Sequence, residues 1–167
     1  MATPTNLPAA QTTGNVLTAA YVNDLRGAFR VLQVVNATYS VATQNTTNTY
    51  ADTGLTITIT PQSTTSKILI LVSHNGCYKQ QGDVSNSLQL RLMRGATNIA
   101  QLANAGGFTN TDVRNDHGSI CGFILDSPAT LSATTYKTQF ANGVNATGVY
   151  VQEGAETSSI IAMEISA

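Results

Sequence analysis

Two histidines are the residues of this chain best suited to metal binding or acid–base chemistry. His74 follows an apolar run, and His117 lies in a polar stretch. No H-x-x-x-H, C-x-x-C or H-E-x-x-H spacing is present, so the sequence gives no support for a zinc site. Asp112, Asp116 and His117 could ligate a divalent cation, but these residue types are also typical of a polar loop with aspartate-supported turns. We interpret them as a loop and expect no metal and no cofactor.

The two cysteines could act as nucleophiles only with a histidine base in hydrogen-bond reach and a third group to orient it. Cys121 lies in the apolar run 120–124, where a thiol is usually inert, and nothing marks Cys77 as reactive. Both are therefore expected to be buried, reduced and apolar in behaviour. Glu153 and Glu156 flank a short loop and offer only a weak basis for a paired-carboxylate glycosidase site. No nucleophile elbow, Walker loop or dinucleotide-binding glycine motif is present, so we predict that the chain is not an enzyme.

The composition excludes several classes of partner. Charged residues make up 10% of the 167 residues, and 8 Lys and Arg face 9 Asp and Glu, so no positive field attracts nucleic acid. No apolar run approaches the roughly 20 residues of a membrane span. The N-terminus lacks a basic and an apolar region, so we see no secretory signal and expect synthesis in a bacterial host cytoplasm.

The first 30 residues are expected to form an arm and one short helix. Residues 1–15 are small, polar and interrupted by prolines, which favours an extended chain that could reach about 50 Å. Residues 18–29 place apolar side chains on one helical face, with Thr18 as a plausible N-cap. A helix of three turns is not stable alone, so it must pack on its own domain or on a partner. The residues predicted to contact a capsid or a neighbouring copy are Pro4, Leu7, Pro8, Leu17, Tyr21 and Leu25.

Residues 31–167 are expected to form one all-β, antiparallel sandwich or barrel, because short β-branched and apolar runs alternate with turn residues. The expected strands are 31–35, 54–60, 68–72, 88–93, 98–102, 119–125, 134–140, 148–152 and 159–165.

Three of these strands are apolar on both faces, which a small sandwich with water on its outside does not explain. The runs 31–35, 68–72 and 160–161 show this pattern. We infer an oligomer in which the outer face of one sheet is buried against copies of the chain, although a few exposed apolar residues are ordinary in a monomer. The predicted trimer-interface residues are Val31, Val34, Val35, Ile68, Ile70, Val72, Ile160 and Ile161.

Several segments of the sequence resemble bacteriophage virion proteins. The resemblance rests on residues 16–26, 52–61, 66–72, 126–129, 134–137 and 161–165. These segments look like those of tail-fibre tip domains and capsid decoration (cement) proteins, including those of phages that infect cyanobacteria. The resemblance covers nearly the whole chain, but its motifs are structural and do not specify a position on the particle. It implies a TNF-like jelly-roll sandwich that trimerises about a three-fold axis, and it carries over no catalytic residue.

Two functions follow from the resemblance. The first is a homotrimeric decoration protein on the outer capsid surface that binds the major capsid protein through residues 1–30. A tail fibre usually has a long shaft before its tip, and we find none in these 167 residues, which favours decoration.

The alternative is a tail-fibre or head-fibre tip that binds a host-surface glycan. Its loops would be 74–87 and 104–118, which contain Tyr78 and Phe108. A third reading, a host-encoded trimeric signalling ligand of similar fold, is disfavoured because no signal peptide and no disulfide framework are seen.

Overall fold

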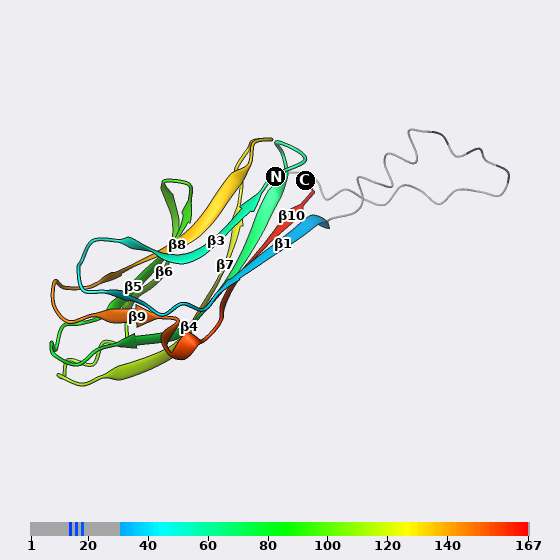
Figure 1. Ribbon diagram of the computed structural model, residues 1–167. Helices are drawn as coiled ribbons and strands as arrows, with labels where there is room; N and C mark the ends of the chain where they lie inside the picture. Colours follow the sequence, from blue (N-terminus) through cyan, green and yellow to red (C-terminus); the bar gives the residue numbers. More distant parts are fainter. Residues whose placement is uncertain (1–13, 15, 17, 19–30, 167) are drawn as a thin grey trace.

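The computed structural model describes residues 31–166 together with residues 14, 16 and 18 (Figure 1). The predicted arm, the helix 18–29 and the six predicted contact residues at positions 4–25 lie outside the described residues. The described elements are β1 (Val31–Tyr39), β2 (Thr43–Asn45), β3 (Ala51–Ile59), β4 (Lys67–Lys79), β5 (Leu88–Arg94), β6 (Thr97–Gly106), β7 (Asn115–Asp126), β8 (Thr134–Asn142), β9 (Val149–Val151), the 3-10 turn η1 (Glu153–Ala155) and β10 (Ser158–Ile165).

The strands form two antiparallel sheets that pack face to face (Figure 1). One sheet has the order β1-β10-β4-β7, with the short strands β9 and β2 continuing it beside the end of β4. The other has the order β3-β8-β5-β6. Most connections pass from one sheet to the other, and strands far apart in sequence pair, as β1 does with β10. This order is that of a jelly roll, and it confirms the predicted all-β, antiparallel sandwich.

The core lies between the sheets and is filled by alternate residues of their strands. Leu55, Ile57 and Ile59 of β3 face Ile68 and Ile70 of β4 in its larger part. A second cluster around Phe140 and Leu90 fills the end near β9. Side chains of a strand alternate between its two faces, so the residues between these are directed outward.

All nine predicted strands are present, but β4 is longer than expected. The dipeptide Asn75-Gly76 is typical of a turn, but β4 continues to Lys79 with its register shifted between His74 and Cys77. Gly76 has a φ of 60°, and a Cβ there would lie 2.5 Å from the backbone nitrogen of Glu153. The glycine therefore serves a β-bulge against η1, not a chain reversal.

Candidate functional site

The two outer faces of the sandwich differ in chemistry, and the face of the β3-β8-β5-β6 sheet is polar. Asp52 accepts hydrogen bonds from Lys137 Nζ at 2.8 Å and from Gln139 Nε2 at 2.7 Å. Arg91 donates to Gln139 Oε1 at 2.7 Å and lies 3.7 Å from the ring centre of Tyr50. Such a network of polar side chains is what a water-facing sheet normally carries.

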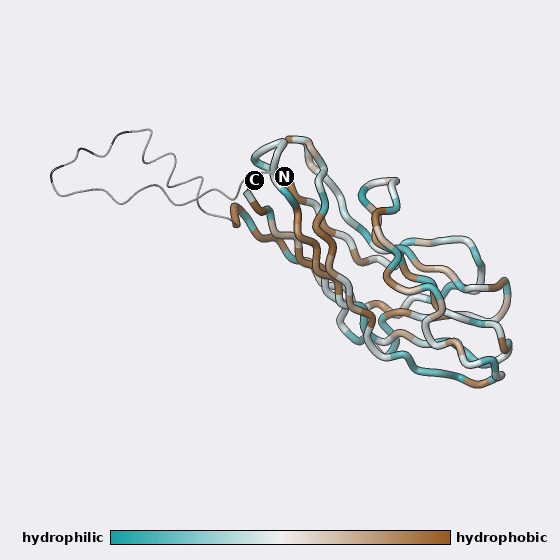
Figure 2. The backbone as a smooth tube through the Cα atoms, turned by 180° about the vertical axis from the view of Figure 1, so that it is seen from behind, coloured by the Kyte–Doolittle hydropathy of each residue, from teal (hydrophilic) through white to brown (hydrophobic). Residues whose placement is uncertain are grey.

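The outer face of the β1-β10-β4-β7 sheet is apolar across all four strands. The strand registers align two rows of outward residues: Val34, Met163, Leu69 and Leu125 in the first, and Asn36, Ile161, Leu71 and Phe123 in the second. Phe123 is 72% exposed, Leu125 59% and Val34 55%. Figure 2 shows hydrophobic stretches on neighbouring strands of this part of the molecule.

We call these seven apolar residues, Val34, Leu69, Leu71, Phe123, Leu125, Ile161 and Met163, the apolar face. None of the seven is charged, and they adjoin one another on four neighbouring strands. Single exposed apolar residues are ordinary, but a contiguous apolar patch of this kind marks an interaction surface. The apolar face is the candidate functional site.

Beyond the apolar face, the next row of the same sheet carries small hydroxyl and thiol side chains. Thr38, Ser159, Ser73 and Cys121 align there, and Cys121 Sγ lies 3.5 Å from Ser73 Oγ. The prediction that both cysteines are buried is therefore wrong for Cys121, which is exposed, and holds for Cys77. The error arose because the run 120–124 is apolar on both faces, so the sequence did not show that Cys121 occupies an outward-facing position.

The residues predicted for the trimer interface separate into two groups. Ile68, Ile70, Val72 and Ile160 are buried in the core, and Val35 packs against it, so these five side chains face the other sheet and not the outer surface. Their strands are apolar on both faces, so the sequence pattern does not show which face is directed outward. The prediction chose the residues of the inner face. Val31, Val34 and Ile161 do lie on the outer face, and their contact with another copy stays a prediction.

The histidine of β4 is a buried structural residue. Thr138 Oγ1 lies 2.7 Å from its Nε2, and Gln152 Nε2 lies 3.1 Å from its Nδ1. Burial lowers the pKa of His74 to about 4. Cys77 Sγ lies near the backbone oxygen of His74, at 3.7 Å, and burial raises the pKa of this thiol to about 12. The two side chains therefore do not form a nucleophile and base pair.

The three candidate cation ligands of the predicted 104–118 loop diverge. Asp112 accepts a hydrogen bond from the backbone of Gly82, and Asp116 pairs with Arg114 at 2.9 Å. Within the described part of the chain, no three His, Cys, Asp or Glu side chains are grouped as a metal site. The two predicted glycan-binding loops are also shorter than expected, because residues 74–79 belong to β4 and residues 115–118 to β7.

No protein-family model matches the chain, and no curated protein matches it significantly. Among the described residues, no helix is long and apolar enough to cross a membrane.

Among solved structures, the chain is similar to three from infectious bursal disease virus. It matches the VP2 subviral particle with 15% identity and a TM-score of 0.41, over 80% of this chain and 32% of that one. It matches the Gx strain structure with 13% identity and a TM-score of 0.38, over 81% of this chain and 38% of that one. It matches the T=1 particles derived from the virus with 16% identity and a TM-score of 0.35, over 81% and 36%. The chain thus spans about a third of the length of these proteins.

Proposed function

We propose that this chain is a structural protein of a bacteriophage particle that forms a homotrimer through the apolar face and decorates the outer capsid shell. The observation that carries the self-association is the contrast between the two outer faces of one sandwich. The resemblance of the sequence to bacteriophage virion proteins supports a place on the particle, and the outer capsid shell is the position that we propose. No catalytic group is needed for this role, because the protein acts by binding.

Burial of the apolar face would supply the free energy of assembly. Removing a Leu, Ile, Met or Phe side chain from water contributes about 1.5–3 kcal/mol. The apolar face has seven apolar residues, of which Phe123, Leu125 and Val34 are the most exposed in one copy and so have most to gain. A closed ring of three copies would cover this surface on each of them, whereas the polar face with Asp52 and Arg91 would stay in water.

The exposed thiol of Cys121 gives a built-in probe of this arrangement. Cys121 lies in the row next to the apolar face, so we expect its reaction with a maleimide to slow at least tenfold when the protein is concentrated enough to trimerise. Cys77 should stay unreactive at every concentration, since it is buried and its pKa is raised to about 12. Mass spectrometry of the labelled protein, at a series of protein concentrations, measures both rates.

The control for this labelling experiment is a cysteine on the other face. Thr58→Cys in a Cys121→Ser background places a thiol on the exposed outer side of β3. Its labelling rate should not depend on protein concentration. A concentration-independent rate at Cys121 in the unaltered chain would contradict the proposed use of the apolar face.

The cementing role makes a separate prediction about capsids. A protein that binds only the assembled shell shifts the equilibrium towards assembly. Purified shells without this protein should therefore rupture at a lower temperature than shells to which it has been added back. The rise in fluorescence of a nucleic-acid dye, as heated shells rupture and expose their contents, measures the rupture temperature. Equal rupture temperatures would refute the cementing role but leave the trimer intact.

A fibre or receptor-binding tip is the second candidate function, and a surface pocket described below favours it. Copy number separates the two. Hundreds of copies per particle by gel densitometry support decoration, whereas a handful supports a fibre. Both candidates use the same trimer, so this measurement does not depend on the labelling experiment.

A further inference from the structure

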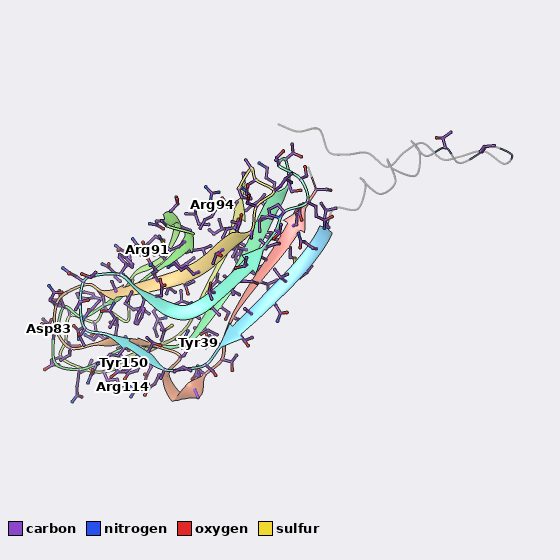
Figure 3. The ribbon with its side chains drawn as sticks, turned by 45° about the horizontal axis from the view of Figure 1, so that its top comes forward. Tyr39, Asp83, Arg91, Arg94, Arg114 and Tyr150 are labelled. Carbon is purple, nitrogen blue, oxygen red and sulfur yellow. The ribbon has the colours of Figure 1, made fainter. Side chains whose placement is uncertain are left out.

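A cavity of about 380 Å³ opens at one end of the β1-β10-β4-β7 sheet. This end lies opposite to the end at which β1 begins. Strand β4 connects the two ends: its Lys67 pairs with Ile165 beside Val31, and its Tyr78 lies in the cavity wall. Eleven residues of extended chain separate them by roughly 35 Å. Figure 3 shows Arg114 and Tyr150 close together at this end, and Arg94 at the other.

Two residues of the cavity lining, Tyr78 and Arg114, belong to a stack of flat side chains that Tyr150 completes from outside the lining. The ring of Tyr78 lies 4.6 Å from that of Tyr150, with 7° between their planes. The guanidinium of Arg114 lies 4.1 Å from the centre of the Tyr78 ring. Asp116 fixes this guanidinium by accepting hydrogen bonds from Nε at 3.0 Å and Nη2 at 2.9 Å. Tyr78 pairs across strands with Tyr150 of β9 and with Asp116 of β7. The backbone registers of these strands therefore position the stack.

Two carboxylates of the cavity lining have free acceptor oxygens. Glu153 and Glu156 line the cavity from η1 and the residue after it, and within the described chain their side chains form no hydrogen bond or ion pair. Burial and then the charge of Glu153 raise the pKa of Tyr78 to about 12. The cavity is therefore a site of negative potential in which only Arg114 supplies a fixed cation.

Glycines make up the rest of the lining and leave room for a ligand. Gly118 and Gly154 have φ values of 78° and 67°, and a Cβ at either position would meet no atom within 4 Å. Tyr78 and Cys77 contribute little exposed surface, because they are almost fully buried. The exposed lining therefore comes mainly from glycine backbone and from the side chains of Arg114, Asp116, Glu153 and Glu156. It mixes polar and apolar atoms, which suits a ligand that carries both polar groups and C–H surface.

We propose that this cavity binds a sugar residue of a surface glycan that carries no carboxylate or phosphate group. Each sugar hydroxyl is both a donor and an acceptor, so it can donate to Glu153 or Glu156 and accept from Arg114. The two unpaired carboxylates disfavour an anionic sugar by charge repulsion. The assignment does not depend on the trimer or on the position of the protein on the particle.

A lysine side chain of a partner protein is the competing occupant, because it would also satisfy the carboxylates. Three observations favour the sugar. The ammonium group of one lysine is small for a cavity of about 380 Å³. Arg114 lies in the same wall and repels a second cation. Both faces of the Tyr78 ring are already covered, by Tyr150 and by Arg114, so this ring offers no cation–π contact.

The test is a titration of the full chain, followed by nuclear magnetic resonance, with methyl glycosides of glucose, galactose, mannose and N-acetylglucosamine. Glucuronic acid and Nα-acetyl-lysine methyl ester are added as separate probes. We expect at least one neutral glycoside to shift the amide signals of Tyr78, Gly118 and Gly154, and the two charged probes to leave them unchanged. Shifts with the lysine ester alone would overturn the proposal in favour of a protein partner, and no shift with any probe would overturn it outright.

Single substitutions test whether the glycoside binds in this cavity. Arg114→Ala should weaken the best glycoside at least tenfold, and Glu153→Gln several-fold. Arg91→Ala is the matched control, because Arg91 also lies over a tyrosine ring, at 3.7 Å, but on the polar face of the other sheet. Arg91→Ala should leave the affinity unchanged, and an equal loss in both arginine variants would overturn the assignment. Sedimentation of the same samples reports the trimer separately, so failure of sugar binding and failure of self-association are distinguished.

Discussion

Replacing Phe123 by glutamate should convert the proposed trimer into monomers and weaken self-association at least a thousandfold. Phe123 is the most exposed apolar side chain of the described chain apart from Val16, and it neighbours Leu71 in the second row of the apolar face. In a trimer the substitution would place a carboxylate in each of the contacts. Burying an unpaired charge costs several kcal/mol, and about 4 kcal/mol corresponds to a thousandfold change in the dissociation constant.

Sedimentation velocity over a range of protein concentrations measures this effect. The unaltered chain should reach three times the 17.5 kDa of one copy, and the variant should stay at one copy. The variant should also fold, because the side chain of Phe123 is 72% exposed in a single copy and contributes little to its core.

The matched control is the same substitution at another exposed phenylalanine. Phe108 is 48% exposed and lies between β6 and β7, away from the apolar face. Phe108→Glu should leave the trimer intact. A monomeric unaltered protein, or a trimeric Phe123→Glu protein, would show that the apolar face does not mediate self-association.

The sequence predicted the fold well because strand signals are local. Clean alternation in 54–60 and turn residues such as those at 94–97 identified β3 and the β5–β6 hairpin without knowledge of their partners. A pattern of alternation also says which side is buried. In 54–60 the apolar residues Leu55, Ile57 and Ile59 alternate with threonines, and all three are buried.

The residues of the apolar face could not be predicted from alternation in the same way. Residues 68–72 are all apolar, so Ile68 and Ile70 were as plausible as Leu69 and Leu71 for the outer side. Only the pairing of β4 with β10 and β7, and the position of the second sheet, decide which set is outward. For the same reason Phe123 and Leu125 were missed, although their strand was predicted.

The cavity depends on contacts between residues that are distant in the sequence. Tyr78, Arg114 and Tyr150 belong to three separate segments, and the register of β4 with β7 and β9 brings them together. The spacing of Glu153 and Glu156 was a reason to consider the two together, but no pattern in the sequence placed them in one cavity with Arg114. The bulge at Gly76, where a Cβ would clash with the backbone of Glu153, lets η1 approach β4.

Acid should destabilise the folded chain through His74, and this is the second large effect that we expect. The imidazole is fully buried between the sheets and bonded only to neutral groups. Thr138 in turn lies 2.6 Å from Thr53 Oγ1, and Gln152 also donates to Ser158 at 3.1 Å. Gln152 Nε2 donates to Nδ1, so Nε2 carries the proton and donates to Thr138. A second proton, on Nδ1, would face the amide donor of Gln152 in a site that is closed to bulk solvent.

The direction of the pH effect follows from the pKa of His74, which burial lowers to about 4 from an ordinary 6.5. As the pH falls below 6.5, the unfolded chain takes up the proton and the folded chain does not, so stability is complete above pH 6.5 and is lost as the pH falls towards 4. One pKa unit corresponds to 1.36 kcal/mol, so the free energy of unfolding should fall by about 2 kcal/mol between pH 7 and pH 5. The carboxylates with lowered pKa values, Asp52 and Glu164, contribute mainly below this window.

Urea unfolding at pH 7, 6 and 5 measures this loss, in the Phe123→Glu background so that dissociation of the trimer does not enter the transition. His74→Gln should cost stability at pH 7, because it disturbs the bonds to Thr138 and Gln152, but it should abolish the loss between pH 7 and pH 5. His117→Gln, at the exposed second histidine, should retain the loss. If the His74→Gln protein loses as much stability as its parent, the acid response has another source, and the buried imidazole is then not the group that limits the fold in acid.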